Sequence, residues 1–464
     1  DRACGEGNLR DIPLISLDTT ETIAAVATPP GVGAVGMIRI SGPEARKVIE
    51  KVFRGRSLHN WIARQQHLGI LVDLGGEEID EVLLCWFPGP GSFTGEDVIE
   101  VSCHGGVIVM KRALDCILAA GARPARPGEF TERAFLNGRM DLTQAEAIMD
   151  LISAQTELAA KAAREQLAGR LGGELEALRQ GLIEVLAHVE AYIDFPEEDI
   201  DPDSSEQMQQ RLSALRKRVE SLLATADQGR ILREGLRTVI CGAPNAGKSS
   251  LLNLLLGFDR AIVNEAAGTT RDTIEEVINL KGIPVRLVDT AGIRNSEEAI
   301  EQEGIERSRV QVENAELVLL VIDSNDSVER VAPIELPESA KVLRILNKSD
   351  LPGHRDWREC DGLRVSCLDP TNADKVRDRL FDEVARREGI NTASLTSINA
   401  RHQHCLKETL EALKQAQGVL GAGESPEFVA MDLRAALNAV GEVIGKTDVE
   451  EILGEIFSTF CIGK

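Results

Sequence analysis

Gly242-Ala-Pro-Asn-Ala-Gly-Lys-Ser249 is the stretch that decides the fold of this chain. A short apolar run, Thr238–Cys241, precedes it, and the largely apolar run Leu251–Leu256 follows it. A glycine-rich loop between a strand and a helix lets backbone N–H groups close around phosphate oxygens. The stretch therefore predicts a phosphate-binding loop, in which Lys248 reaches the β- and γ-phosphates and Ser249 ligates Mg²⁺. The alternative is a glycine turn before a buried helix.

Later stretches supply the other parts of a guanine-nucleotide-binding domain, in the order that such a domain requires. Thr270 offers a hydroxyl as a second Mg²⁺ ligand and γ-phosphate sensor. A carboxylate at Asp350 can accept from guanine N1–H and N2–H₂, a donor pair that adenine lacks, so the substrate is predicted to be GTP rather than ATP. The motifs are Gly268-Thr-Thr-Arg-Asp272, Asp289-Thr-Ala-Gly292, Asn347-Lys-Ser-Asp350 and Ser366-Cys-Leu368.

Composition limits the classes of partner and compartment. The chain carries 52 basic and 75 acidic side chains and a formal charge of −23, so it repels phosphate backbones at long range. A nucleic-acid contact then needs a local basic patch, for which Arg123–Arg133 and Arg211–Arg218 are candidates. The sequence has no apolar run of about 18 residues and no signal-peptide pattern. Its nine cysteines form no C-x-x-C pair, which indicates free thiols and a cytoplasmic location.

One further cluster, His402-Gln-His404-Cys405, has no second group of ligands at metal-binding spacing. We interpret these residues as solvated helix positions rather than as a metal site.

Periodicity predicts a multidomain chain that combines α+β and α/β parts, with ample length for two to four domains at 464 residues. The predicted domains are a strand-rich α+β domain at 19–142, helices at 143–235, a P-loop G domain at 236–388, and helices again at 389–464. Helices on both sides of the G domain favour one discontinuous helical domain with the G domain inserted into it. Two unrelated helical domains are the alternative.

The chain resembles the MnmE/TrmE family of tRNA-modification GTPases over nearly its whole length. The sequence departs from the family pattern at few places: an extension before Thr20, Glu450-Glu451 where the family more usually has Glu-Asp, and Cys367 where it more usually has alanine. The resemblance rests on Asp18–Gly42, Phe87–Asp97, Arg126–Asn137, Asp194–Glu198, the nucleotide motifs and the end of the chain, Ile456–Lys464.

For the N-terminal domain, the resemblance implies a tetrahydrofolate-binding-like fold that forms a homodimer. It also implies a complex with the flavin protein MnmG/GidA that adds an aminomethyl or carboxymethylaminomethyl group to C5 of the wobble uridine of certain tRNAs. The one-carbon donor would be 5-formyltetrahydrofolate or a related folate. The matching folate contacts are Arg39, Glu100, Arg139 and Lys464. For Arg39 and Arg139, a surface salt bridge is the alternative.

For the G domain, position 293 holds isoleucine, where Ras-like enzymes place a water-orienting glutamine. The resemblance implies K⁺ held by Asn245 and by backbone carbonyls of Asn264, Ala266 and Thr269; an arginine from a partner is the other route. Glu301 matches the family's water-positioning acid, although alone it resembles any surface glutamate. The candidate GTP contacts are Asn245, Ala246, Gly247, Lys248, Ser249, Ser250, Asn264, Glu265, Ala266, Ala267, Gly268, Thr269, Thr270, Asp289, Thr290, Ala291, Gly292, Asn347, Lys348, Asp350, Ser366, Cys367 and Leu368.

Cys461, in the terminal Cys-Ile-Gly-Lys464, is the remaining candidate for catalysis, beside Lys248 and Glu301. It is either a buried thiol that closes the apolar run Ile456–Ile462 or a catalytic thiol whose thiolate Arg39 or Lys464 favours. The resemblance favours the catalytic thiol. A second function remains open at this point: a GTP-dependent RNA- or ribosome-binding switch without modification chemistry.

Overall fold

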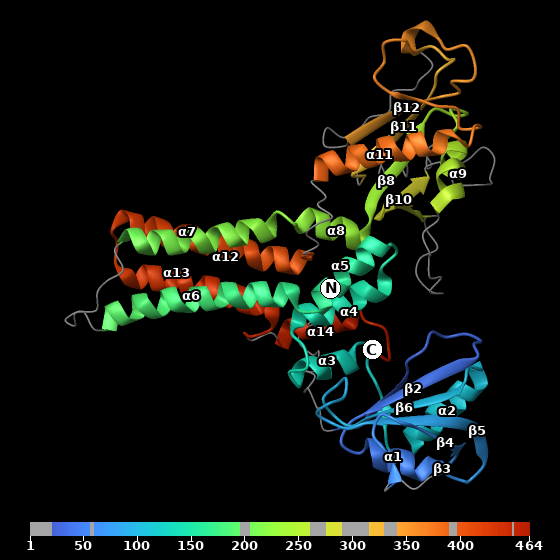
Figure 1. The fold of residues 1–464 in the computed structure, drawn as a ribbon, viewed down its shortest axis with the longest axis vertical. Coiled ribbons are helices and arrows are strands. Elements are labelled where there is room, and N and C mark those ends of the chain that lie inside the picture. The colour runs from blue at the N-terminus through green and yellow to red at the C-terminus, as the bar shows by residue number, and fades with distance from the viewer. Residues whose placement is uncertain are drawn as a thin grey trace, which may run out of the picture. The chain divides into compact units, whose positions relative to one another are not determined.

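The computed structural model describes residues 21–55, 60–194, 205–259, 275–289, 315–328, 341–388, 397–447 and 450–464. Contacts divide the chain into two compact units. Unit 1 comprises Asp1–Ala145 and Val449–Lys464, and unit 2 comprises Glu146–Asp448. Figure 1 shows the ribbon of the chain, with helices and strands labelled where there is room.

Unit 1 contains a mixed seven-stranded sheet in the order β3-β4-β5-β6-β2-β1-β7. Its pairs are antiparallel except for β1 with β7. Helices α1 (Ala45–Val52) and α2 (Val107–Ala119) pack with the sheet around one apolar core. The strands are β1 (Ile23–Val26), β2 (Val35–Ser41), β3 (Phe53–Gly55), β4 (Gln66–Val72), β5 (Glu78–Phe87), β6 (Val98–His104) and β7 (Arg123–Pro124).

The end of the chain packs within unit 1. Helix α14 (Glu450–Ser458) contacts α3 (Glu129–Leu136). Gly128, just before α3, has φ 67°, and a Cβ there would lie 2.7 Å from the Phe457 carbonyl oxygen. Only glycine suits that left-handed position at such a close approach. Residues 449–464 therefore group with the N-terminal sheet by contact, whereas the sequence assigns them to the second helical segment 389–464.

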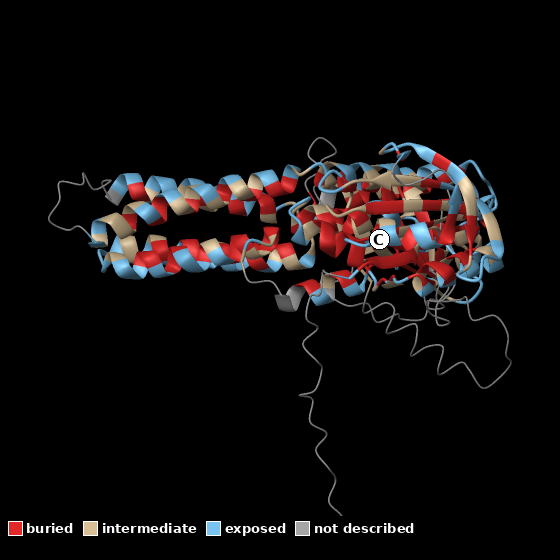
Figure 2. Cartoon of the chain, turned by 90° about the horizontal axis from the view of Figure 1, so that it is seen from below, coloured by how far each residue is buried: buried red, intermediate tan, exposed pale blue. Residues whose placement is uncertain are grey.

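The helices of unit 2 form a bundle from both sides of the G segment. Buried residues of α6, α7, α12 and α13 share one apolar core, and Figure 2 shows buried positions on the facing sides of the bundle helices. Within the described residues, no helix is long and apolar enough to cross a membrane. The helices are α4 (Leu142–Ser153), α5 (Glu157–Leu167), α6 (Arg170–Asp194), α7 (Ser205–Leu223), α8 (Ala226–Glu234), α12 (Ala400–Ala422) and α13 (Pro426–Ile444).

The G segment folds as a six-stranded sheet in the order β13-β12-β11-β8-β10-β9, parallel except that β9 runs antiparallel to β10. Strand β8 lies between β11 and β10, so the strand order reverses around it. Ligands of such sheets bind where the order reverses, beyond the carboxyl ends of the strands. The elements are β8 (Leu236–Gly242), α9 (Lys248–Asp259), β9 (Glu275–Leu280), β10 (Ile283–Asp289), β11 (Leu317–Asp323), β12 (Lys341–Asn347), η3 (Arg355–Trp357), β13 (Leu363–Arg364) and α11 (Asn372–Glu388).

A buried charged cluster stabilises the bundle at the start of α12. Glu146 accepts from Arg401 Nε at 3.0 Å and Nη2 at 3.1 Å, and from His402 Nε2 at 2.5 Å. The backbone N–H of Asn399 donates to His402 Nδ1, so the proton sits on Nε2. Burial lowers the pKa of His402 despite the nearby Glu146 carboxylate, and the ring stays neutral.

The solvated interpretation of residues 402–405 is therefore wrong for His402 and Cys405, which are both buried; His404 is exposed. The reason is tertiary: Glu146 of α4 supplies a partner that is 256 residues away in the chain. Among the described residues, no group of three or more His, Cys, Asp or Glu side chains is arranged to hold a metal.

Replacing Glu146 with alanine is expected to lower the free energy of unfolding of the bundle by about 3–5 kcal/mol, because it leaves the fully buried His402 and the half-buried Arg401 without their carboxylate partner. Burial opposes ionisation of Glu146, but His402 and Arg401 outweigh it and hold its pKa below the usual value. The stabilisation that ionised Glu146 provides is therefore full above its pKa in the unfolded chain, about 4.3, and is lost as the pH falls below that value. Urea unfolding followed by circular dichroism at pH 7 and at lower pH measures both effects.

The matched control is Glu408→Ala, which removes an exposed carboxylate paired with His404 at 3.5 Å. Exposed pairs contribute about 0–1 kcal/mol, so this variant should unfold almost like the wild type. Equal losses in the two variants would contradict the role given to Glu146.

Candidate functional site

The first candidate site is the loop between β8 and α9. Its backbone takes positive φ at Gly242 (153°), Asn245 (61°) and Gly247 (103°). A Cβ on Gly242 would lie 2.2 Å from the Val321 carbonyl oxygen, and one on Gly247 would lie 2.1 Å from Asn347 Nδ2. Both glycines are therefore required by close approach as well as by φ.

Lys248 and Ser249 begin α9, where the first backbone N–H groups have no helical acceptor. Lys248 Nζ donates to the carbonyl oxygens of Gly242 at 3.0 Å and Ala243 at 2.9 Å, so the ammonium lies over the loop. Ser249 is exposed. Donors, positive charge and an exposed hydroxyl together suit an anionic group with its Mg²⁺ ion.

Asn347 connects two of the predicted nucleotide motifs. Its Nδ2 donates to the Ala246 carbonyl oxygen at 2.8 Å, and its Oδ1 accepts from Cys367 N at 3.0 Å. The buried amide thus joins the phosphate loop to residues 366–368. Burial raises the pKa of the Cys367 thiol to about 11, so this thiol is protonated at neutral pH.

Sequence reasoning missed Asp323, at the end of β11. Its Oδ2 pairs with Lys348 Nζ at 2.5 Å, and Asn325 donates to its Oδ1. Burial opposes ionisation, but these hydrogen bonds hold the pKa of Asp323 below its usual value. The apolar run Leu317–Ile322 that ends in this aspartate was the available signal. Asp350 and Leu368 are exposed at the same edge of the sheet, after β12 and β13.

Several predicted residues lie outside the described part of the chain. The backbone of Asp289 ends β10 and pairs in register with Ile240 of β8, which places that strand end beside the start of the phosphate loop. The predicted residues outside the described ranges are Asn264, Glu265, Ala266, Ala267, Gly268, Thr269, Thr270, Thr290, Ala291, Gly292, Ile293 and Glu301.

The second candidate site lies on the sheet of unit 1. Arg39 of β2 and Glu100 of β6 are register partners, and Arg39 Nη2 lies 2.8 Å from Glu100 Oε1. Their side chains are 15% and 21% exposed, so a charged ligand can reach both. The Arg39 guanidinium lies 5.5 Å from the Phe93 ring centroid and 5.8 Å from that of Phe130. The salt bridge foreseen as an alternative for Arg39 thus exists, with Glu100 as its partner.

The chain terminus reaches the same place. Ile462 forms an antiparallel bridge with Pro127, and Gly128 N donates to the Cys461 carbonyl oxygen at 3.4 Å. The Gly463 carbonyl oxygen accepts from Arg39 Nη1 at 3.4 Å. Among the described cysteines only Cys461 is exposed, so the buried-thiol alternative is wrong. Burial and the neighbouring Arg39 lower the pKa of Lys464.

Arg139 is exposed and lies next to Gly95, since a Cβ on Gly95 would be 3.4 Å from Arg139 Cγ. Arg39, Glu100 and the Gly463 carbonyl oxygen therefore meet directly, and Lys464 is close enough to interact electrostatically with Arg39 and Glu100. Arg139 lies against the loop that carries Gly95 and Phe93.

The arginines of 123–133 do not form the basic patch considered from the sequence. Arg123 pairs with Glu129 at 2.6 Å, Arg126 with Glu132 at 3.0 Å, and Arg133 with Glu96 at 2.9 Å. Folding places carboxylates against these arginines, so their charges are compensated.

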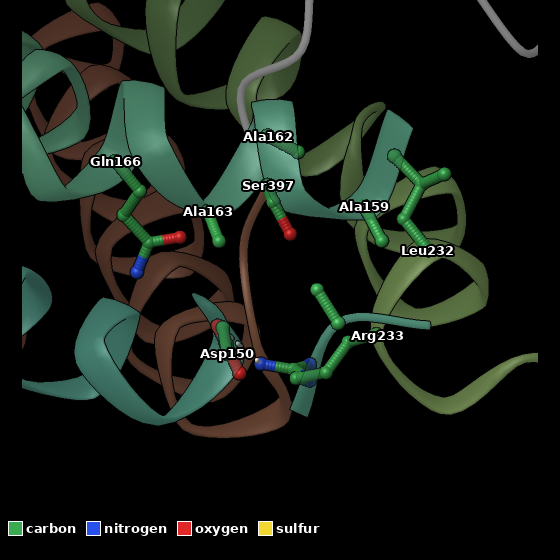
Figure 3. A pocket seen from close by; sticks show the side chains of 9 residues that line it. Asp150, Ala159, Ala162, Ala163, Gln166, Leu232, Arg233 and Ser397 are labelled. Atoms are coloured by element: carbon green, nitrogen blue, oxygen red, sulfur yellow. Dashed lines mark ion pairs between the residues drawn. The ribbon is translucent and has the colours of Figure 1, made fainter. Parts of the chain in front are cut away.

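A small pocket in unit 2 belongs to neither candidate site. Four alanines belong to its lining, and Figure 3 shows Asp150 and Arg233 facing each other. Their closest charged atoms are 3.9 Å apart. Burial raises the pKa of Asp150 to about 6.

Comparisons with known proteins show which family the chain belongs to. Residues 142–461 match the model of the MnmE helical domain, and residues 22–139 match that of the GTP-binding protein TrmE N-terminus. Proteins called tRNA modification GTPase MnmE are similar over nearly the whole chain. That of Akkermansia muciniphila is 49% identical over 96% of this chain and 100% of its own length. That of Natranaerobius thermophilus is 44% identical over the same shares, and that of Clostridioides difficile is 42% identical over 96% of this chain and 99% of its own.

Proposed function

Because this chain belongs to the MnmE/TrmE family of tRNA modification GTPases, we propose that GTP hydrolysis in its G segment serves a uridine-modifying reaction at the Arg39–Cys461 site of unit 1. The chain is a GTP hydrolase that acts in tRNA modification. The alternative function, a GTP-dependent RNA- or ribosome-binding switch without modification chemistry, is therefore not adopted. The observation that carries the proposal is the exposed Cys461 thiol, two residues before Gly463, whose carbonyl oxygen accepts from Arg39. A protein that used GTP only to switch between conformations would not require this exposed thiol.

The reaction proposed is addition of an aminomethyl or carboxymethylaminomethyl group to C5 of the wobble uridine of certain tRNAs, together with the flavin protein MnmG/GidA. We place the folate donor, 5-formyltetrahydrofolate or a relative, against Arg39, Glu100, Arg139 and Lys464. Basic groups suit its carboxylates, Glu100 suits its N–H donors, and the Phe93 ring beside Arg39 offers a stacking surface. The folate would supply the one-carbon unit.

For GTP, Lys248 and the N–H groups of the phosphate loop would bind the β- and γ-phosphates. Ser249 and Thr270 would hold Mg²⁺, which neutralises phosphate charge. Lys348, through its salt bridge with Asp323, and Asp350 would face the guanine. Asn347 would keep the phosphate loop and the 366–368 loop in register with each other.

No glutamine follows Gly292 to orient water, so another group must do so. Asn245 and the carbonyls of Asn264, Ala266 and Thr269 would hold K⁺, and Glu301 would position water. The exposed Asn245, at a left-handed position of the phosphate loop, fits a ligand for such an ion. K⁺ would supply positive charge against the γ-phosphate, as an arginine finger does elsewhere.

The proposed assembly is a homodimer through unit 1 that binds the flavin protein and tRNA. Domain limits of 19–142, 143–235, 236–388 and 389–464 remain a proposal. The proposal also includes the assignment of the G segment as an inserted Ras-like G domain and of unit 1 as a folate-binding-like fold.

GTP turnover is expected to be roughly tenfold or more faster in KCl than in NaCl at equal ionic strength. The reason is that K⁺ would offset the negative charge of the γ-phosphate, which no arginine of the phosphate loop offsets. Asn245→Ala should lose the stimulation. Asn253→Ala, an exposed asparagine on α9, is the control and should keep it. Steady-state phosphate release measures all three. Equal wild-type rates in both salts would contradict the cation site and point to an arginine donated by a partner.

A further inference from the structure

Two segments of unit 1 border the candidate folate site: Phe87–Asp97 and Arg126–Asn137. The structure joins them. Glu96 of the first pairs with Arg133 of the second, and Asn137 Nδ2 donates to the Thr94 carbonyl oxygen at 2.7 Å. Residues 88–97, called the 88–97 loop below, are thus fixed to α3.

Arg133 is a buried cation with several acceptors. Its side chain is only 2% exposed. Nη1 donates to Glu96 Oε2 at 2.9 Å and Oε1 at 3.2 Å, and Nη2 donates to the Glu21 carbonyl oxygen at 2.8 Å. A buried charge is costly unless it is paired and hydrogen-bonded, so the position of Arg133 fixes the position of its partners.

Glu96 extends this connection to strand β2. Its Oε2 accepts from Ser41 Oγ at 2.7 Å, and Ser41 Oγ lies 2.7 Å from Thr94 Oγ1. Ser41 is two residues from Arg39, so both side chains project from the same face of the sheet. The Arg133–Glu96 pair therefore ties the 88–97 loop to the face that carries Arg39.

The loop in turn touches both candidate folate arginines. Phe93 lies under the Arg39 guanidinium at 5.5 Å, and Gly95 lies against Arg139. The other end of the α3 segment holds the chain terminus, through Pro127 with Ile462 and Gly128 with Cys461. One segment thus contacts the loop and the tail that together border the candidate site.

The geometry points to Arg133 as a positioning residue for one-carbon transfer: through Glu96 it fixes the 88–97 loop so that Phe93 supports Arg39. Arg133 itself does not touch the ligand. This inference rests on the proposed folate site. It adds the ion pair between Arg133 and Glu96 as the contact that shapes that site.

The test compares Arg133→Met, Arg133→Lys and the double variant Glu96→Gln/Arg133→Met. Calorimetry measures the Kd of 5-formyltetrahydrofolate, and hydrogen exchange measures protection of the loop amides. We expect Arg133→Met to weaken binding roughly 10- to 100-fold through displacement of the loop. Its loop amides should exchange faster, and Arg133→Lys should restore part of both, since it keeps the charge.

The double variant separates positioning from folding. It carries no unpaired buried charge, so its thermal stability should return toward that of the wild type. Weak binding and fast loop exchange should nevertheless persist, because the bonds that hold the loop are still absent. The control is Arg112→Met, which breaks an exposed pair with Glu77 elsewhere in unit 1 and should change neither readout.

A double variant with wild-type affinity and wild-type loop exchange would overturn the inference. Failure of the wild type to bind the folate would instead remove the folate assignment made above. In that case loop exchange still decides whether Arg133 fixes the loop, because that readout needs no ligand.

Discussion

A Cys461→Ser variant is expected to hydrolyse GTP at the wild-type rate and to lose tRNA modification. Serine keeps the shape of cysteine but is a far weaker nucleophile at neutral pH. The backbone around position 461 is held through the Cys461 carbonyl and the Ile462 bridge, neither of which the substitution alters. The loss should therefore be chemical rather than structural. Phosphate release and nucleoside analysis of tRNA from a complemented strain measure the two activities.

Cys360→Ser is the matched control, because it removes a half-buried thiol from the G segment. It should modify tRNA normally. Unchanged modification in Cys461→Ser would show that the exposed thiol takes no part, and would leave the terminal segment a structural role only.

An Asp350→Asn variant is expected to bind GTP roughly 10²- to 10⁴-fold more weakly, a range typical of sites whose hydrogen bonds to substrate become mismatched. The asparagine NH₂ would face the N–H donors of guanine. Xanthine carries a carbonyl oxygen in place of the guanine amino group, so the variant should gain affinity for xanthosine triphosphate. Asp350 is exposed at the end of the Asn347–Asp350 motif, so the change should not disturb the core.

Titration with fluorescent guanine and xanthine nucleotides measures this exchange of preference. Asp361→Asn, which alters an exposed carboxylate just before β13, should keep the wild-type preference. Unaltered GTP affinity in Asp350→Asn would mean that another group reads the base.

The phosphate loop could be predicted because its requirements are local. The positive φ at Gly242 and Gly247, the strand before them and the helix after them all lie within residues 236–259. The alternating strands β1, β2 and β6 and the helical periods of α6 and α13 were predictable for the same reason. Strand β4 could not be predicted in this way, since its residues do not alternate cleanly: its burial runs exposed, buried, exposed and then partly buried or buried.

Side-chain partners across the chain could not be predicted. His402 seemed solvated until Glu146 was found against it, and Arg133 seemed part of a basic patch until Glu96 was found beside it. Whether a charged group is solvated, paired or buried depends on which distant segment folds onto it.

The sequence by itself determined that this chain has a GTP-binding loop, helices on both sides of it and a family-like terminus with Cys461. Only the tertiary structure decided that the terminus packs within unit 1, that Cys461 is exposed two residues before a carbonyl oxygen that Arg39 contacts, and that Arg133 is a buried cation paired with Glu96 of the 88–97 loop. The physical reason is the distance along the chain over which each property is determined. Backbone conformation and helix or strand period are set by neighbouring residues, whereas burial and ion pairing are set by contacts between residues far apart in the chain, such as Arg39 and Gly463.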